Sequence, residues 1–385
     1  HSIGFEWDID GDADHDGTVS VRYRKAGACN FSPAMPLVRT DYSWFWLDEQ
    51  AAEPVNNFAG SLMFLTPGTT YEVVLELRDP DGGRAIRIHN LTTRAIPRKP
   101  TAGRTLHVVP GSGGGDGSSE NPFRGLGSAN AAARPGDTFL LHAGAYNGTE
   151  RLSASGQPGE YIVWEPAGDG TPIIESLEIT GDHIWLDQLT FRHGSAEDAI
   201  VVPWGRPFHA PFDVVITNNE FTGYPAAIRA RYDSSGWTIM DNTIVGDKRE
   251  GVGSGSGGDL DGWGIQGSSH GGHVFAYNRI SRVGDGIGCG ANSDCYGNDV
   301  FDVSDDSITT DYSYANVRVW GNRMHEAAAY HISLQPQYAG PWYFIRNQMG
   351  PAGYPVNSLF VITTSNGAWN GRPQGTTIAS SAEPC

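Results

Sequence analysis

The second half of the chain repeats an asparagine that is followed, nine or ten residues later, by an isoleucine. The last three steps between these asparagines are 20, 24 and 25 residues long. A period in the twenties indicates one supersecondary unit stacked on itself, and β-rich repeats of this length predict a parallel β-helix, with equivalent residues about 4.8 Å apart. The pairs are Asn219 and Ile228, Asn278 and Ile287, Asn298 and Ile308, and Asn322 and Ile332, and Asn347 begins a fifth turn.

The composition favours an all-β chain with many turns. Among 385 residues there are 51 glycines and 23 prolines, and only 18% of the residues are charged. No run of helical periodicity exceeds about two turns. We therefore predict an all-β protein in which a parallel β-helix follows a small β-sandwich. The recurring asparagine suits a turn in which its amide bonds the coils above and below.

The charge and the cysteines limit the partners and the compartment. A net charge of −18 makes nucleic acid a poor partner, because phosphate binding needs clustered Lys and Arg. The acidity keeps a secreted protein soluble, or in part binds calcium. No apolar stretch approaches about 18 residues, so no membrane span is expected. Cys289 and Cys295 flank a short loop and would close it as a disulfide in an oxidising compartment. We expect a secreted monomer.

Residues 1–96 read as alternating strands of a β-sandwich. The segment Leu65-Thr-Pro-Gly-Thr-Thr-Tyr71 resembles the tyrosine corner of fibronectin type III domains, in which the tyrosine hydroxyl bonds nearby backbone. The acidic run at Asp12, Asp14, Asp16 and Gly17 matches the first positions of a calcium loop, but Tyr23 stands where a glutamate ligand belongs. We interpret the run as a hairpin turn between the first two strands, with a weak calcium site as the alternative.

Residues 97–105 read as a linker, and residues 106–385 as the β-helix. The glycine-rich segment 111–117 and the alanine-rich segment 131–133 resemble the entry coil of secreted right-handed parallel β-helix proteins, where a loop and a short helix cap the stack. The segment 246–262 exceeds one coil and is a candidate cleft wall or lid. The last residues lack an amphipathic cap, so we expect that the natural β-helix continues or ends unusually.

Counting from the isoleucines brings several polar residues onto one face. Asp285 and Asp306 stand two places before Ile287 and Ile308, and Asp305 is adjacent. Stacked carboxylates do not all ionise easily without a cation or a proton between them. They therefore act as general acid and base in glycosidic hydrolysis, hold Ca²⁺ for β-elimination on a uronate, or form a solvated turn ladder. The residues assigned to this face are Asp285, Asp306, Asp311, His331 and Gln335.

These segments resemble polygalacturonase-like hydrolases. The matching motifs are Asp285-Gly-Ile287, Asp305-Asp-Ser-Ile308 and Tyr330-His-Ile332. The resemblance implies that Asp285 and Asp305 act on the water, that Asp306 is the acid and that His331 assists. It covers about fifty residues. Val283-Gly284 replaces the family's Asn-Thr, no Arg-Ile-Lys motif follows, and the nearest basic candidate is Arg346.

The function predicted is a secreted polysaccharide-degrading glycoside hydrolase that needs no cofactor. The first alternative is a Ca²⁺-dependent polysaccharide lyase, with Ca²⁺ at Asp285, Asp306 and Asp311, and the second is a non-catalytic glycan-binding or adhesion β-helix. The sandwich is a spacer or docking module in each case. Aromatic and polar residues on neighbouring coils would bind the sugar, namely Arg231, Trp263, Gln266, Asp311, Tyr312, Tyr330 and Gln335.

Overall fold

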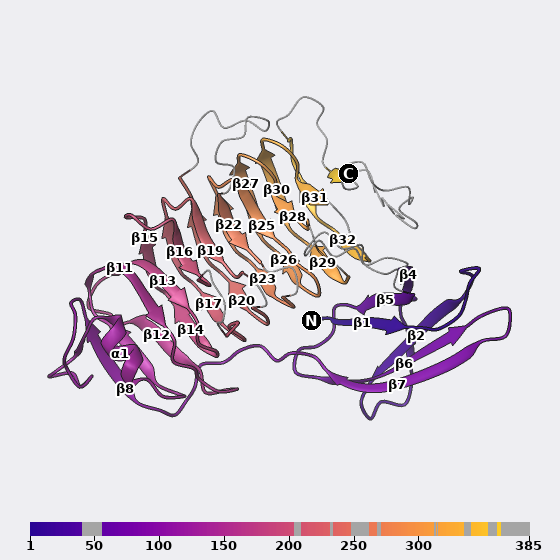
Figure 1. Ribbon diagram of the computed structural model, residues 1–385, viewed down its shortest axis with the longest axis horizontal. Coiled ribbons are helices and arrows are strands. Elements are labelled where there is room, and N and C mark those ends of the chain that lie inside the picture. The colour runs from indigo at the N-terminus through magenta and orange to yellow at the C-terminus, as the bar shows by residue number, and fades with distance from the viewer. Residues whose placement is uncertain are drawn as a thin grey trace.

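The computed structural model describes residues 1–40, 56–203, 209–231, 234–247, 262–267, 271–311, 313, 315–334, 340–352 and 360–362. These residues form an antiparallel two-sheet unit followed by a long parallel β-helix (Figure 1). The predicted all-β fold with a parallel β-helix is confirmed. Of the elements described, only α1 (Leu126–Ala132) is an α-helix, and no helix in the described part is long and apolar enough to span a membrane.

Three strands make up each rung of the β-helix from Ile184 onward, and equivalent strands of successive rungs pair in parallel. Row 1 contains β14 (Ile184–Asp187), β17 (Val215–Thr217), β20 (Thr238–Met240), β23 (Val274–Ala276), β26 (Asp294–Tyr296), β29 (Val317–Trp320) and β32 (Trp342–Ile345). Row 2 contains β15 (Thr190–Arg192), β18 (Glu220–Thr222), β21 (Thr243–Val245), β24 (Arg279–Ser281), β27 (Asp299–Val303), β30 (Arg323–Ala327) and β33 (Gln348–Met349). Row 3 contains β16 (Asp198–Val201), β19 (Ala226–Arg229), β22 (Trp263–Gln266), β25 (Asp285–Gly288), β28 (Ile308–Thr309), β31 (Ile332–Leu334) and β34 (Phe360–Ile362).

The asparagines form a ladder at the corner between row 1 and row 2. The Oδ1 atom of Asn298 accepts the main-chain amide and the side-chain amide of Asn278, both at 3.0 Å. The Nδ2 atom of Asn298 donates to the carbonyl of Phe275 at 2.9 Å and to Oδ1 of Asn322 at 2.9 Å. The same pattern runs from Asn219 through Asn242 to Asn347. The structural role predicted for these residues is confirmed, since each buried amide is satisfied by the neighbouring rungs.

The isoleucines form a column in the core behind row 3. Ile228, Ile265, Ile287, Ile308 and Ile332 are consecutive register partners and have no exposed surface. Ile265 is the register isoleucine of the rung that begins near Asn242. The long interval between Asn242 and Asn278 conceals this rung in the sequence. The stacked rings of Phe191 and Phe221, 4.7 Å apart, continue the same close packing behind row 2.

The first strands of the β-helix are longer and lie at the end that α1 covers (Figure 1). They are β8 (Thr105–Val109), β9 (Phe123–Arg124), β10 (Thr138–Leu141), β11 (Gly144–Leu152), β12 (Ile162–Pro166) and β13 (Pro172–Ile179). The helix α1 buries Leu126 and Ala129, and its position agrees with the cap expected from the glycine-rich segment. β13 is the point where row 2 and row 3 diverge, because its first half pairs with β15 and its second half with β16.

The N-terminal unit packs one three-stranded sheet against one four-stranded sheet. The first contains β1 (Ile3–Asp8), β5 (Asn57–Leu62) and β4 (Val38–Thr40), and the second contains β3 (Ser32–Pro33), β2 (Thr18–Lys25), β6 (Thr70–Arg78) and β7 (Arg84–Thr92). Phe58, Tyr71 and Val73 lie in the core between them. The main-chain amide of Thr66 donates to the Tyr71 hydroxyl at 2.9 Å, as the corner motif predicts.

The acidic run after β1 is not a hairpin turn, because β1 pairs with β5 and β2 pairs with β6 in the other sheet. The run crosses between the sheets. Within it, Oδ1 of Asp12 accepts the main-chain amides of Asp16 and Gly17, and its other oxygen pairs with Arg39. One oxygen from each of Asp12, Asp16 and Asp79 lies within 4.8 Å of the others, so the weak calcium site stays a prediction.

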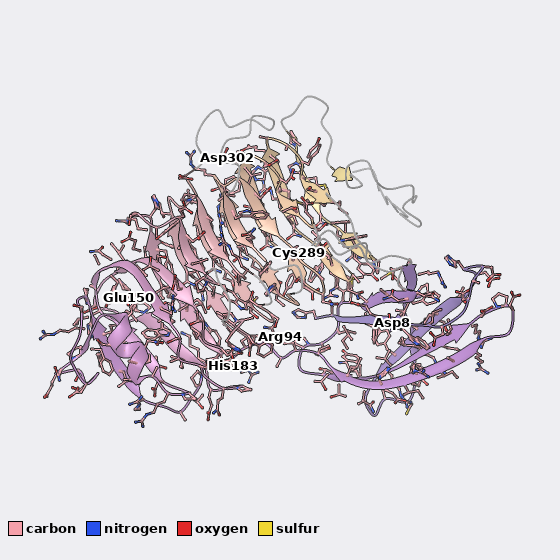
Figure 2. The ribbon with its side chains drawn as sticks, in the orientation of Figure 1. Asp8, Arg94, Glu150, His183, Cys289 and Asp302 are labelled. Atoms are coloured by element: carbon pink, nitrogen blue, oxygen red, sulfur yellow. A yellow bond between two sulfur atoms is a disulfide. The ribbon has the colours of Figure 1, made fainter. Side chains whose placement is uncertain are left out.

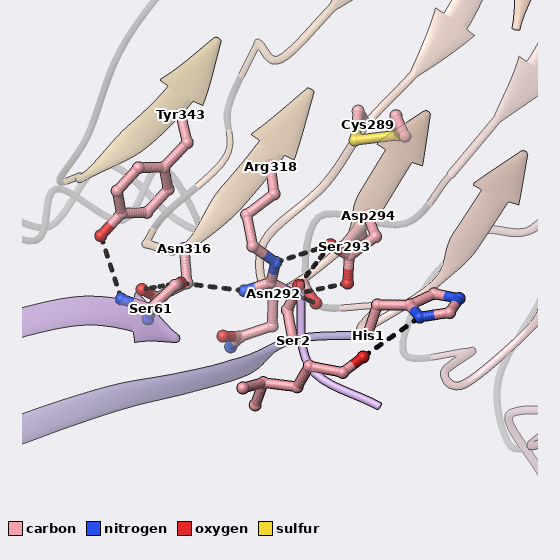
Figure 3. A network of polar contacts seen from close by, with 12 residues as sticks. His1, Ser2, Ser61, Cys289, Asn292, Ser293, Asp294, Asn316, Arg318 and Tyr343 are labelled. Carbon is pink, nitrogen blue, oxygen red and sulfur yellow. Dashed lines mark hydrogen bonds and ion pairs between the residues drawn. A yellow bond between two sulfur atoms is a disulfide. The ribbon is translucent and has the colours of Figure 1, made fainter. Parts of the chain in front are cut away.

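The N-terminal unit docks on row 1 through a buried polar network (Figure 3). Arg318 of β29 bonds both carboxylate oxygens of Asp294 on β26, at 3.0 and 3.2 Å, and donates to the Ser61 hydroxyl of β5 at 3.1 Å. Ser61 in turn donates to Asn316, and its amide donates to the Tyr343 hydroxyl. A buried ion pair of this kind is satisfied only when all its partners are in place, so the network fixes how the two units meet.

The linker adds contacts at the opposite end of row 1, where Arg94 lies between the units near His183 (Figure 2). Arg94 pairs with Asp213 at 3.2 Å, and Asp213 also accepts from the Tyr161 hydroxyl at 2.8 Å and contacts His183 at 3.0 Å. Lys99 pairs with Glu165 and Asp187 on the same side. The N-terminal unit and its linker thus contact the row 1 side of the β-helix.

Candidate functional site

A column of acidic residues stands at the corner where row 2 turns into row 3. Asp285 opens β25, and Asp306 stands at the equivalent position on the next rung, since Ile287 pairs with Ile308. The main-chain amide of Asp306 donates to Oδ1 of Asp285 at 3.1 Å. On the following rung the amide of Tyr330 donates to Oδ1 of Asp306 at 3.0 Å. The side chains are therefore held by the rungs themselves, and the predicted register of Asp285, Asp306 and Tyr330 is the observed one.

Three carboxylates converge at this corner. One oxygen from each of Asp285, Asp305 and Asp306 lies within 4.8 Å of the others. Asp285 and Asp305 are partly exposed, and Asp306 is 7% exposed. We call these three residues the carboxylate cluster. Two hydrogen bonds from main-chain amides fix its geometry, and the described part of the chain places no cationic side chain in an ion pair with any member.

The surroundings favour the protonated forms. Burial, with a smaller contribution from the nearby Asp305 charge, raises the pKa of Asp306 to about 7. Burial also raises the pKa of Asp285 well above its ordinary value, together with the charges of Asp305 and Asp306. Burial raises the pKa of Asp305. Carboxylates this close titrate as a unit, so the cluster retains protons at pH values at which isolated aspartates are ionised.

His331 does not lie on this face, which corrects the expectation from the sequence. Its side chain is fully buried, with Nδ1 3.0 Å from the Ser307 hydroxyl and Nε2 2.9 Å from the carbonyl of Gly350. Ser307 and Gly286 occupy the equivalent position on the two preceding rungs. A Cβ on Gly286 would lie 2.4 Å from the core atom Cγ1 of Val300, so a side chain at this position points into the core. The residue before each isoleucine thus points inward at this corner, so His331 has a structural role.

Asp311 lies close to the cluster without joining it. Its Oδ1 atom accepts the Ser333 hydroxyl at 2.9 Å, and the same hydroxyl lowers the pKa of Asp306 by hydrogen bonding. The three carboxylates whose oxygens lie close enough to one another to hold a metal ion include that of Asp305 and not that of Asp311. Of the three residues predicted to hold Ca²⁺, Asp285 and Asp306 belong to this group and Asp311 does not, and calcium binding itself stays a prediction.

Three of the predicted sugar-binding residues lie on the rungs that precede the cluster. Trp263 opens β22 and is the register partner of Asp285. Gln266 pairs with Gly288, and its Oε1 atom is buried without a hydrogen-bond partner among the described residues. Arg231 lies one rung earlier and approaches Asp198, with 4.0 Å between Nη2 and Oδ2. Tyr312 and Gln335 lie outside the described residues, as does most of the long segment 246–262.

Two residues next to the cluster were missed by the sequence reasoning. Ser333 bridges Asp311 and Asp306, and Gly288 lies under the ring of Trp263. Both follow a register isoleucine by one position, so the count that found Asp285 and Asp306 also reaches them. Neither residue type draws attention by itself, because serine and glycine are common in turns.

The predicted disulfide is present between Cys289 and Cys295, with sulfurs 2.07 Å apart, and Cys29 is free and exposed. Cys289 follows β25 directly, and Cys295 lies in β26, so the bond closes the turn between the cluster strand and row 1 (Figure 2). That turn contains Asn292, whose carbonyl accepts from Arg318. The strand that begins with Asp285 is thus joined to the interface with the N-terminal unit.

Comparison with known proteins gives likeness of fold only. No protein-family model and no curated protein matches the sequence. A structure of XylC with xylose resembles the chain with a TM-score of 0.37 and 12% identity, over 65% of this chain and 68% of that one. The catalytic domain of a GH87 α-1,3-glucanase with tetrasaccharides gives 0.35 and 11%, over 90% of this chain and 65% of that one. These values carry no argument about activity.

Proposed function

We propose that the protein is a polysaccharide-degrading enzyme, a glycoside hydrolase that acts through the carboxylate cluster. The observation that supports this is the convergence of Asp285, Asp305 and Asp306 within 4.8 Å beside a tryptophan on the outer side of the stack. Glycosidic hydrolysis needs one carboxylic acid to protonate the leaving oxygen and one carboxylate to assist the incoming water or the sugar cation. The disulfide supports secretion into an oxidising compartment.

Asp306 is assigned as the general acid. Its Oδ1 atom already accepts the Tyr330 amide, so Oδ2 is the oxygen left to carry and deliver the proton. A pKa of about 7 keeps that proton in place at mildly acidic pH. Asp305 is the residue that activates the water, because it is partly exposed and, among the described residues, its side chain accepts no hydrogen bond from the neighbouring rungs. Asp285 accepts a hydrogen bond from the main-chain amide of Asp306, and the charges of the two carboxylates affect each other.

A Ca²⁺-dependent lyase is the second candidate, and it is favoured by the same convergence of oxygens. Asp285, Asp305 and Asp306 would hold the ion, since Ca²⁺ prefers several carboxylate oxygens. When bound, the ion would neutralise a uronate and acidify its C5 proton. The residues of this chain would in that case serve as ligands rather than as acid and base.

The deciding experiment uses a panel of homogalacturonan, xylan, galactan, and α- and β-glucans. Wild type and Asp306→Asn are compared in EDTA and in CaCl₂, and both reducing ends and unsaturated products are measured. We expect reducing ends in EDTA, no unsaturated product, and loss of activity in the variant. Asp302→Asn is the matched control, because Asp302 lies on β27 of the same rung, is partly exposed and has left-handed backbone that asparagine also adopts, and its carboxylate is 3.8 Å from Arg282.

Two other results would replace the proposal. Unsaturated product that requires Ca²⁺ would establish the lyase. Binding of a polymer without any product, in wild type and in Asp306→Asn alike, would establish a non-catalytic glycan-binding β-helix.

A further inference from the structure

The indole of Trp263 lies across Gly288 on the next rung. A Cβ on Gly288 would stand 3.0 Å from Cζ3 and 3.6 Å from Cη2 of this ring, so a side chain at position 288 would press on the indole. The main chain of Trp263 is paired with that of Asp285. The ring therefore lies beside the carboxylate cluster, where it is partly exposed.

The residues that follow Gly288 in the same register column are small and uncharged. Gly288 is followed on successive rungs by Thr309 and Ser333. Thr309 and Ser333 are buried, so the indole of Trp263 is the partly exposed aromatic face next to Asp285 and Asp306. Such a combination of one aromatic face with a few polar groups is typical of sugar-binding clefts.

The cluster differs from two other acidic groups of the β-helix, Asp198 and Asp294, each of which pairs with an arginine. Asp198, on the same column three rungs before Asp285, has Arg229 with Nε at 2.8 Å from Oδ1. Asp294 has Arg318 at 3.0 Å. The members of the carboxylate cluster are bonded by main-chain amides and the Ser333 hydroxyl, and no cationic side chain in the described ranges pairs with them. A sugar carboxylate placed here would add a further acidic group to three that already raise one another's pKa or are raised by burial, with no cationic partner among the described residues.

We propose that the subsite beside the carboxylate cluster accepts a neutral pyranose ring packed on Trp263 and rejects the corresponding uronate. The inference rests on the proposed function, and it narrows the substrate to polymers whose reacting sugar is uncharged. It departs from the uronate polymer of the lyase alternative, and it does not use the basic residue that the polygalacturonase resemblance suggests. The basic residue suggested by that resemblance, Arg346, lies before the Asn347 rung of the ladder, at the corner between row 1 and row 2.

The test is a binding measurement, so that it is independent of turnover. Asp306→Asn is run in affinity gels that contain EDTA and one member of a polymer pair. The pairs are carboxyl-reduced homogalacturonan with homogalacturonan, and β-glucan and α-glucan with their C6-oxidised forms. We expect the neutral member of at least one pair to retard the protein about tenfold more strongly than its acidic partner, a difference of about 1.4 kcal/mol. Equal or stronger binding of the acidic member in EDTA, or binding to no pair, would overturn the inference.

Variants of the platform separate stacking from general effects on the fold. Trp263→Ala and Gly288→Val, each combined with Asp306→Asn, are expected to lose about tenfold or more in binding, whereas Trp263→Phe retains most of it. Trp7→Ala, at a partly exposed tryptophan of the N-terminal unit, is the control and should bind normally. Normal binding by Trp263→Ala contradicts the inference. Cleavage that depends on Asp306 would still support the hydrolase in that event, so the two proposals fail separately.

Discussion

The main-chain amide of Asp306 donates to the carboxylate of Asp285 on the preceding rung, at 3.1 Å. The bond ties the position of one acidic side chain to the backbone that carries the next. Because Asp306 repeats the arrangement with Tyr330, the cluster is assembled by the pairing of β25, β28 and β31 and not by flexible loops. A site supported in this way is pre-organised, which is what acid and base catalysis requires.

Replacing Asp306 by Asn should abolish hydrolysis without unfolding the protein. The Asn oxygen still accepts the Tyr330 amide, but the side chain has no acidic proton. We expect the rate to fall by about 10²–10⁴-fold, the usual contribution of a general acid. Reducing-end assays measure the loss, and circular dichroism checks the fold. Unchanged turnover in a folded Asp306→Asn protein would refute the assignment, provided that Asp302→Asn behaves as wild type.

The activity should decline as the pH rises through about 7. Burial and the neighbouring Asp305 raise the pKa of Asp306 to about 7, and a general acid works only while it is protonated. Rate profiles of kcat/KM against pH should therefore show an alkaline limb with a midpoint near that value. A profile that stays flat from mildly acid to mildly alkaline pH would contradict the role of Asp306.

Stability should also fall as the pH rises from about 4 to about 7. In this range the native Asp306 holds a proton that the unfolded chain, with its ordinary pKa of 3.8, has already released. Each pKa unit of difference corresponds to about 1.4 kcal/mol, so a rise of about three units makes the loss on the order of 4 kcal/mol. Urea unfolding at the two ends of the range measures it. Asp306→Asn should show a smaller fall, and an identical pH dependence in both proteins would disprove the explanation.

Asn298→Ala should be among the most destabilising single substitutions of the β-helix. It removes an oxygen that accepts two amide groups of Asn278 and a donor to Phe275 and Asn322, all inside the stack. Buried groups left without partners cost about 1–3 kcal/mol each, so we expect a loss of roughly 3 kcal/mol in unfolding free energy. Asn347→Ala is the comparison, because Asn347 is part-buried. A larger effect at Asn347 than at Asn298 would argue against the ladder as the cause.

Arg318→Leu should weaken the docking of the N-terminal unit. The substitution leaves Asp294 buried without its cation and removes the donor to Ser61. Breaking one partner of a buried pair costs about 3–5 kcal/mol. Thermal unfolding should show a lower midpoint, and Asp294→Asn in the same chain should restore part of the loss. An Arg318→Leu protein as stable as wild type would show that the pair contributes nothing.

Much of the β-helix is readable from the sequence because its register is periodic. The asparagines and isoleucines repeat at fixed offsets, and stacking converts equal offsets into contacts, so Asp285 and Asp306 could be placed together by counting. His331 could not, because strict alternation of side chains fails at the corner before row 3, where two successive residues face inward. The crossing of the acidic run between two sheets was hidden too, since local turn residues do not reveal which strand pairs with which.

The asparagine ladder also determines where this protein is free to vary. It fixes the exit from row 1 on every rung, so an added residue there would break hydrogen bonds both above and below. The turn from row 2 to row 3 carries no asparagine of the ladder, and between β21 and β22 the chain there is longer than on the neighbouring rungs. Evolution can thus lengthen or replace the chain beside the acidic corner, and so change which glycan fits, while the register of the rungs stays unchanged.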